Sequence, residues 1–193
     1  MSFRRIAVYC ASSNATVGRY GAAARSVGRR LAEQGIGVVY GGGRVGLMGQ
    51  VADGALEAGG EVIGVIPSKL MDLELGHHGC TELIVVPSMH ARKLRMAELS
   101  DAFIALPGGW GTWEELFEVV TWTQLGYHRK PCGVLNLDGY YDPILAMVDR
   151  ALEQGFVRPE LRDLLVQSED LDALIERLSA AEVPDIERWI HRT

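Results

Sequence analysis

Residues 102–115 read AFIALPGGWGTWEE: a short apolar run, a turn with three glycines, and the start of a segment with helical spacing. Residues 37–50, GVVYGGGRVGLMGQ, repeat the same order of apolar run, glycine-rich turn and helical segment. A strand that passes through a glycine turn directly into a helix is typical of α/β proteins with a parallel sheet. The two stretches therefore predict an α/β fold, and their turns are the first places to look for a binding site.

The rest of the chain continues this alternation from end to end. The apolar or β-branched runs are residues 5–10, 37–40, 61–66, 83–86, 102–106 and 132–137, with a short seventh run at 164–167. Helical patterns occupy residues 17–34, a segment ending near 58, 89–100, a segment ending near 125, 141–154 and 171–180, and residues 68–80 are expected to form a loop. Because strands that are apolar throughout belong to sheets covered on both faces, we predict a Rossmann-like, doubly wound parallel sheet of about six or seven strands. Since no repeat or linker divides the chain, we expect residues 1–193 to form a single domain.

Composition limits the classes of function. The chain has 193 residues, a formal net charge of −6, 23 glycines and only 7 prolines. Glycine is nearly twice its average usage of about 7%, which indicates tight turns or close backbone approaches. The acidic charge argues against a nucleic-acid-binding surface. Since no apolar run approaches the ~20 residues of a membrane span and the N-terminus lacks a signal-peptide core, we expect a cytoplasmic protein that binds no membrane.

Cysteine and histidine provide no metal-binding pattern. Cys10, Cys80 and Cys132 are far apart in the sequence and are expected to be reduced, mostly buried thiols. The adjacent pair His77 and His78 is expected to be a solvated loop feature without a chemical role. We therefore expect neither a metal site nor a disulfide.

The first glycine turn has the G-x-G-x-x-G spacing of dinucleotide-binding turns at Gly41, Gly43 and Gly46. Two features argue against NAD binding. In dinucleotide-binding folds this turn follows the first strand, and an acidic residue for the ribose hydroxyls ends the next strand. Here the turn follows the second strand, and Glu61 begins the next strand. Amides at a helix N-terminus still favour an anion, so the turn predicts phosphate binding at Gly42 and Gly43. The alternative is a tight turn that lets helix and strand pack closely.

The second glycine turn, residues 107–115, combines an anion site with a carboxylate. The predicted phosphate-binding residues of this turn are Gly108, Gly109, Gly111 and Thr112. The two turns together are expected to form one phosphate cradle. In the helix that follows, the predicted buried stripe is Trp113, Leu116, Phe117 and Val120. Glu115 lies off that stripe, either beside the ligand or as a partner of the helix dipole.

Arg92 is a charged residue on an apolar helix face. Met89, Met96 and Leu99 share that face, which Arg92 joins by its spacing. A buried arginine needs a partner or a ligand, although a snorkelling or salt-bridged side chain is the alternative. Because this helix begins at the ligand edge of the sheet, Arg92 and Glu115 are expected to face one site.

These paired motifs resemble a known family. P-G-G-x-G-T-x-x-E at 107–115 and M-H-x-R-K at 89–93 are similar to motifs of the cytokinin riboside 5′-monophosphate phosphoribohydrolases, the Lonely Guy family, and the resemblance covers nearly the whole chain. It implies hydrolysis of the N-glycosidic bond of N6-substituted adenosine 5′-monophosphates, which releases the free cytokinin base and ribose 5-phosphate. It also implies that no cofactor is needed, and that the protein is a homodimer in which residues from the partner complete the site.

The resemblance further assigns individual residues. It implies that Arg92 and Glu115 are the catalytic pair. The substrate-contacting positions that it implies are Glu74, Arg92, Lys93, Gly109, Trp110, Gly111, Thr112, Trp113, Glu114, Glu115 and Thr121. Trp110 and Trp113 stand where the family more usually has Tyr and Leu, so the family's preferred N6 substituent need not hold here.

The chemistry of the residues agrees with this implication. Cleavage of an N-glycosidic bond builds positive charge on the ribose, which a nearby carboxylate stabilises. An arginine orients the reacting groups or neutralises the departing base, and phosphate anchoring holds the bond in place. Two other functions fit the same turns: a nucleotide or cofactor carrier without catalysis, and a general purine-monophosphate nucleosidase. Trp122 is expected to face either the core or a dimer surface.

Overall fold

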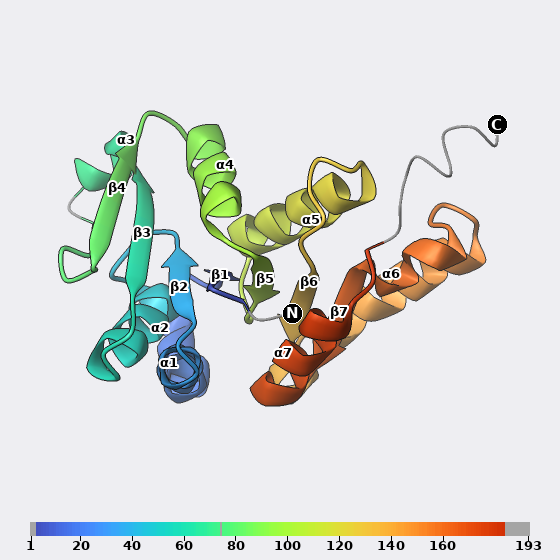
Figure 1. The fold of residues 1–193 in the computed structure, drawn as a ribbon, viewed down its shortest axis with the longest axis horizontal. Helices are drawn as coiled ribbons and strands as arrows, with labels where there is room; N and C mark the ends of the chain where they lie inside the picture. Colours follow the sequence, from blue (N-terminus) through green and yellow to red (C-terminus); the bar gives the residue numbers. More distant parts are fainter. Residues whose placement is uncertain (1–2, 74, 184–193) are drawn as a thin grey trace.

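The computed structural model describes residues 3–73 and 75–183, whose strands form one parallel sheet between two layers of helices (Figure 1). The strands are β1 Arg5–Tyr9, β2 Gly37–Tyr40, β3 Val62–Pro67, β4 Glu82–Val86, β5 Ala102–Ala105, β6 Cys132–Leu135 and β7 Leu165–Ser168. The α-helices are α1 Val17–Glu33, α2 Gly46–Glu57, α3 Ser68–Met71, α4 Met89–Leu99, α5 Trp110–Gln124, α6 Asp142–Glu153 and α7 Leu171–Ala180. Short 3-10 helices are η1 Asn14–Thr16, η2 Leu137–Gly139 and η3 Pro159–Leu164. The predicted Rossmann-like fold is confirmed, and the expected loop at 68–80 differs only in containing α3.

The order of the strands fixes where a ligand can bind. The sheet runs β4-β3-β2-β1-β5-β6-β7, so the chain reverses its direction across the sheet between β1 and β5. Open α/β sheets bind ligands at such a reversal, outside the carboxyl ends of the strands. Tyr9 pairs with Ala105 at that end, and the Ala11 N–H donates to the Pro107 carbonyl at 3.2 Å. The segments after β1 and β5 therefore leave the sheet side by side.

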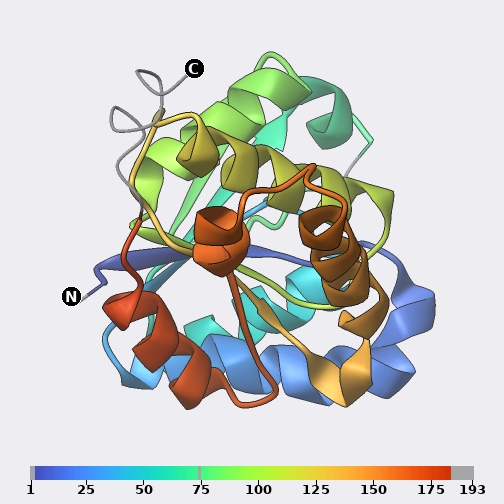
Figure 2. The same cartoon turned by 90° about the vertical axis from the view of Figure 1, so that its right-hand side faces the viewer.

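Two apolar cores lie on opposite faces of the sheet. In Figure 2, α1, α2 and α7 lie below the sheet, and α4 and α5 lie above it. Ile6 and Val8 of β1 pack into the core between the sheet and helices α1 and α2, whereas Ala7 and Tyr9 pack on the side of α4 and α5. Among the described residues, no helix is long and apolar enough to cross a bilayer.

Glycines end three of the helices. Gly35, Gly59 and Gly155 follow α1, α2 and α6 with φ of 72°, 76° and 76°. This left-handed conformation is the common helix C-cap that glycine adopts without steric cost.

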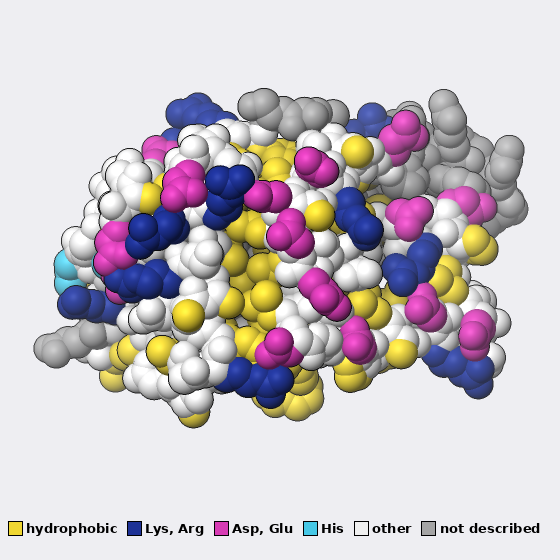
Figure 3. Space-filling view, turned by 90° about the horizontal axis from the view of Figure 1, so that it is seen from below, with side chains coloured by type: hydrophobic (Ala, Val, Ile, Leu, Met, Phe, Trp, Pro, Cys, Tyr) yellow, Lys and Arg dark blue, Asp and Glu magenta, His cyan; other side chains and the backbone are white. Residues whose placement is uncertain are grey.

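The face formed by α1, α2 and α7 carries both signs of charge. Figure 3 shows acidic and basic side chains interspersed on this side of the molecule. Arg25 of α1 pairs with Glu57 of α2, and Arg30 of α1 pairs with Asp172 of α7 at 2.9 Å. Acidic and basic side chains are thus mixed among the described residues of this face.

Candidate active site

A cleft of about 720 Å³ opens where the strand order reverses. Its walls come from the segment after β1, the glycine turn after β2, the start of α4 and the turn that opens α5. One part of the wall is apolar and includes Met48, Ile66, Leu70, Leu75 and Met89. The size and the mixed lining fit a small organic ligand that carries a charged group.

Arg92 and Glu115 meet in this cleft. The Arg92 Nη2 atom lies 3.3 Å from Glu115 Oε1, and the two side chains are only 10% and 7% exposed. Burial raises the pKa of Glu115 to about 7, although the Arg92 charge opposes that rise. The Arg92 Nε atom is buried and has no hydrogen-bond partner among the described residues. The pair therefore combines a carboxylate poised near neutral pH with a guanidinium that has one unused donor.

The prediction that Glu115 lies off the buried stripe of α5 is wrong. The buried residues of this helix are Thr112, Glu115, Leu116, Val119 and Thr123, whereas Trp113, Phe117 and Val120 are half-buried. The first two turns of α5 line the cleft, so their inward face meets the cleft and Arg92 instead of the apolar core. A carboxylate on this face has a charged partner, which an apolar core would not provide.

Gly41 of the first glycine turn makes room for Arg92. A Cβ atom at this position would collide with the Arg92 guanidinium. The absence of a side chain thus lets the cation lie directly on the backbone at the end of β2.

Other parts of the first turn favour close packing. The Gly46 N–H donates to Asn14 Oδ1 at 2.9 Å, and the Leu47 N–H donates to the Ala11 carbonyl at 2.8 Å. These first amides of α2 are therefore already bound within the protein. Gly43 lines the cleft and Gly42 does not, and phosphate binding by either residue stays a prediction.

The second turn leaves the N-terminus of α5 open. A Cβ atom at Gly109 or Gly111 would have no neighbour within 4 Å, and no side chain caps the helix at Gly109. The first amides of a helix have no partner inside the helix, so this end is suited to an anion. Gly108 packs against the Thr112 hydroxyl, which leaves no space for a larger residue.

Two tyrosines after β6 hold the second turn in place, and reasoning from the sequence missed both. Tyr140 donates its hydroxyl hydrogen to the Gly108 carbonyl, and Tyr141 donates to the Leu106 carbonyl at 2.7 Å. The stretch LNLDGYYD at 135–142 contains them, but its spacing alone does not reveal contacts with residues more than 30 positions earlier.

The implied substrate-contacting residues separate into two groups. The cleft brings together Arg92, Gly109, Trp110, Gly111, Thr112, Trp113, Glu114 and Glu115. Lys93 does not line the cleft, because its ammonium bonds Glu114 and Glu118. Thr121 also lies elsewhere and donates to the Phe117 carbonyl at 2.6 Å. Glu74 lies outside the described residues.

The prediction of a solvated His77 is wrong. Its side chain is 5% exposed, its Nε2 lies 3.0 Å from Asp53 Oδ1, and its Nδ1 accepts the Gly79 N–H at 3.2 Å. The loop folds back onto the first glycine turn, where the His77 N–H donates to the Gly42 carbonyl at 2.9 Å. His78 is exposed, as expected. His77 thus anchors the loop that brings Leu75 to the cleft wall.

The cysteines are free thiols, as expected. Cys10 and Cys132 are buried, which raises the pKa of both thiols and keeps them protonated. Among the described residues, no group of three or more His, Cys, Asp and Glu side chains is arranged to hold a metal ion.

Solved structures of low sequence identity share this fold. The molybdenum cofactor carrier protein of Chlamydomonas reinhardtii superposes with a TM-score of 0.70 at 23% identity, covering 93% of this chain and 100% of that protein. The molybdenum cofactor binding protein of Rippkaea orientalis has a TM-score of 0.66 at 25% identity, with 91% and 97% coverage.

Sequence comparison gives a closer relationship. The cytokinin riboside 5′-monophosphate phosphoribohydrolase LOG of Oryza sativa subsp. japonica is 47% identical over 185 residues, covering 96% of this chain and 76% of its own length. A cytokinin riboside 5′-monophosphate phosphoribohydrolase of Arabidopsis thaliana is 48% identical over 176 residues, with 91% and 82% coverage. The sequence model of the family described as "Possible lysine decarboxylase" matches residues 48–178. The chain therefore belongs to the family of the cytokinin riboside 5′-monophosphate phosphoribohydrolases.

Proposed function

We propose that this protein hydrolyses the N-glycosidic bond of N6-substituted adenosine 5′-monophosphates, and of AMP itself, to the free base and ribose 5-phosphate. The observation that carries the proposal is the buried Arg92–Glu115 pair beside the open N-terminus of α5, in a cleft of nucleotide size. Relatives at 47% and 48% identity are named for this reaction on cytokinin riboside 5′-monophosphates, which supports the same substrate class here.

The 5′-phosphate is proposed to bind at the second glycine turn. Gly109 and Gly111 leave the first amides of α5 accessible, and Thr112 adds a hydroxyl at the same helix end. Amides at a helix N-terminus stabilise phosphate through both hydrogen bonds and the helix dipole. This anchor places the ribose near Glu115, which lies three residues after Thr112 on the same face of α5.

The reaction needs charge stabilisation at the ribose and at the base. As the bond between C1′ and the base nitrogen breaks, its electron pair leaves with the base and positive charge develops on the ribose. The Glu115 carboxylate stabilises this charge and takes a proton from the water whose oxygen bonds C1′. Arg92 orients the carboxylate and supplies donors to the sugar or the departing base. The base then takes up one proton, so that one water is consumed for each bond broken.

The family description as a lysine decarboxylase receives no support from the cleft. Among the described residues that line it there is no lysine. Lys93, the buried lysine nearest to Arg92 in the chain, is bonded to two carboxylates. An ammonium held in this way is not available to form a Schiff base with pyridoxal phosphate.

A nucleotide or cofactor carrier is the second candidate, because carrier proteins for the molybdenum cofactor share the fold. Their 23% identity supports the fold alone, and a carrier would not require a buried Arg92–Glu115 pair. Incubation with AMP followed by chromatography for adenine distinguishes the two functions, since a carrier releases no base.

The decisive experiment compares kcat/KM for AMP, GMP, CMP and N6-prenylated AMP, together with adenosine as a substrate without phosphate. We expect N6-prenylated AMP or AMP to be preferred, and adenosine to be far poorer because it lacks the anchoring group. Equal rates for GMP and AMP would instead favour a general purine-monophosphate nucleosidase. Equal rates for adenosine and AMP would contradict the phosphate site at α5.

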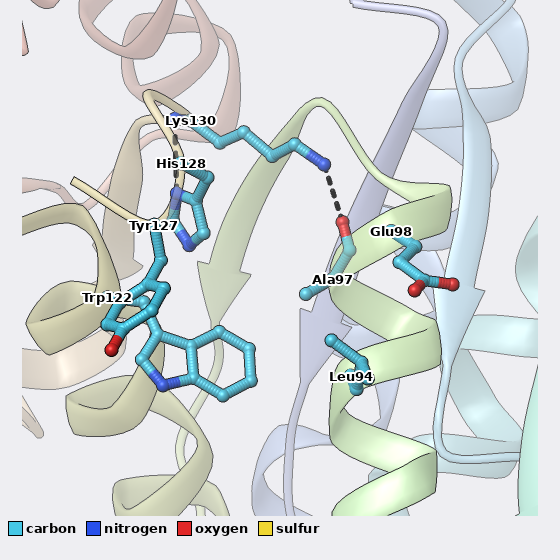
Figure 4. A pocket seen from close by; sticks show the side chains of 7 residues that line it. All are labelled: Leu94, Ala97, Glu98, Trp122, Tyr127, His128 and Lys130. Carbon is cyan, nitrogen blue, oxygen red and sulfur yellow. Dashed lines mark hydrogen bonds between the residues drawn. The ribbon is translucent and has the colours of Figure 1, made fainter.

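We also propose that the protein is a cytoplasmic homodimer. A groove of about 380 Å³ lies beside α4. In Figure 4, Trp122, Tyr127 and His128 line one side of it, and Leu94 and Ala97 of α4 line the other. Leu94 and Tyr127 are 53% and 78% exposed, so the groove rim offers apolar surface for a second copy of the chain. Light scattering tests this: the native chain is expected to have the mass of a dimer, and Leu94→Glu that of a monomer.

A further inference from the structure

Lys93 points away from the cleft although it is the neighbour of Arg92 on α4. Its Nζ bonds Glu118 Oε1 at 3.0 Å and also contacts Glu114, and its side chain is only 5% exposed. Glu114 and Glu118 are four residues apart and share one face of α5. A single buried ammonium therefore joins two successive turns of α5 to α4, two helices that lie side by side in Figure 2.

The catalytic pair itself is held less firmly. Arg92 reaches Glu115 through one contact of 3.3 Å, longer than the 2.7–2.9 Å of a strong charge-assisted hydrogen bond. Because Lys93 follows Arg92 and Glu114 precedes Glu115, both ion pairs bridge the same two helices one residue apart. Any sliding or rotation of α4 against α5 would therefore change the distance between Arg92 and Glu115.

We propose that Lys93 is a positioning residue that locks α4 to α5 and does not bind the substrate phosphate. Its ammonium holds the two helices at the separation that the Arg92–Glu115 pair requires. The proposal rests on the proposed hydrolysis in one respect, namely that Glu115 acts in it.

The same ammonium affects the charge state of Glu115. From α4, Arg92 and Lys93 favour the ionised carboxylate, whereas Glu114 and Glu118 of α5 oppose it. Tyr9 of β1 and Cys10, which follows that strand, face the same region as neutral groups. Replacement of Lys93 by a neutral residue removes one cation and leaves both neighbouring carboxylates uncompensated. All of these changes raise the pKa of Glu115.

The first test measures the carboxyl group directly in Lys93→Met, whose side chain has a similar length and no charge. The 13C carboxyl resonance of Glu115, assigned by its loss in Glu115→Gln, is followed as a function of pH. We expect its midpoint to rise by about one pH unit. We also expect kcat at pH 7 to fall about tenfold, while KM and the Kd of ribose 5-phosphate change less than about twofold. Arg95→Met is the matched control, because Arg95 is a cation of α4 that pairs only with Glu98 of its own helix among the described residues.

The second test is a double-mutant cycle with Glu118→Gln, which leaves Glu114 as the remaining partner of Lys93. If Lys93 acts through Glu118, the double variant is no slower than Lys93→Met alone. This arm also serves if Lys93→Met fails to fold, because Glu118→Gln removes one of the two ion pairs of Lys93 that join α4 to α5. We expect it to lower kcat at high pH, where Glu115 is fully ionised, with KM unchanged. The loss of the Glu118 charge is expected to lower the Glu115 midpoint.

Several results would overturn the proposal. One such result is that Lys93→Met binds ribose 5-phosphate about tenfold more weakly while its kcat is unchanged. If, in addition, the effects of Lys93→Met and Glu118→Gln on this affinity were additive, Lys93 would be a phosphate ligand. If the pH midpoint of the Glu115 carboxyl titration were unchanged in both variants, the inference that Lys93 and Glu118 affect the charge of Glu115 would be refuted. If the native protein hydrolysed no nucleotide, the proposed function would fail, yet the carboxyl titration would still decide whether Lys93 controls Glu115.

Discussion

The replacement of Glu115 by Gln removes one charge from the cleft and almost no volume. The carboxylate is buried and lies against Arg92, and a glutamine carbonyl still accepts a hydrogen bond from that guanidinium. The N-terminus of α5 is untouched, so the proposed phosphate anchor remains. The substitution therefore separates the chemistry at the ribose from the binding of the nucleotide.

The size of the expected loss follows from the burial of Glu115. A positive charge on the ribose about 4 Å from a carboxylate is stabilised by about 4 kcal/mol at an effective dielectric constant near 20. That free energy corresponds to about 10³ in rate. Because Glu115 is only 6% exposed, water screens this interaction little. We expect kcat to fall by about 10³ and the Kd of ribose 5-phosphate to change less than about threefold.

The assay is chromatographic measurement of released adenine under saturating AMP, with calorimetry for ribose 5-phosphate. Glu98→Gln is the control, since Glu98 is exposed on α4 and pairs with Arg95. Its activity is expected to equal that of the native protein. A Glu115→Gln variant that keeps more than about a tenth of the native kcat would refute the electrostatic argument, since a loss of only tenfold corresponds to about 1.4 kcal/mol.

Three further predictions follow from the same contacts. Because burial raises the pKa of Glu115 to about 7, kcat is expected to decline as pH falls through 7 in the native protein, which a pH–rate profile measures. The folded-state pKa of about 7 lies above the ordinary value of 4.5 for a glutamate, so stability is lost as pH rises from 4.5 through 7. Glu115→Gln is therefore expected to raise the free energy of unfolding at pH 8 by up to about 3 kcal/mol and to have no effect below about pH 4.5, as urea titrations would report. Gly41→Ala is expected to displace Arg92 and to lower kcat by about 10². Gly18→Ala is the control, because a Cβ atom at that position meets no neighbour within 4 Å, and its kinetics are expected to be unchanged. Equal activity of the two variants would contradict the role of Gly41.

Local patterns in the sequence predict most of the fold. Apolar runs of four to six residues, glycine turns and helical spacing locate every strand of the described sheet within two residues. Arg92 could be singled out because a charge interrupts an apolar helix face, and the cleft includes it. Such features depend on neighbours within one or two turns, which the sequence displays directly.

Contacts between distant segments could not be predicted in this way. His77 is buried because its loop returns to Gly42 and Asp53, neither of which is close in the sequence. The bond of Lys93 to Glu118 depends on the rotation of α4 relative to α5, which spacing within either helix does not define. The burial of Glu115 was missed for a similar reason, since it depends on how far α5 extends beyond β5.

The glycine excess has two different physical causes at the two turns. Gly41 and Gly46 lack side chains because Arg92 and the backbone after β1 lie directly against them. Gly109 and Gly111 instead face open space at the start of α5. Substitutions in the first turn should therefore act on the position of Arg92, the proposed catalytic arginine, and lower kcat. Substitutions in the second turn should act on the proposed phosphate site and raise KM. The glycine-rich composition thus separates into one turn that makes room for Arg92 and another that leaves the start of α5 open.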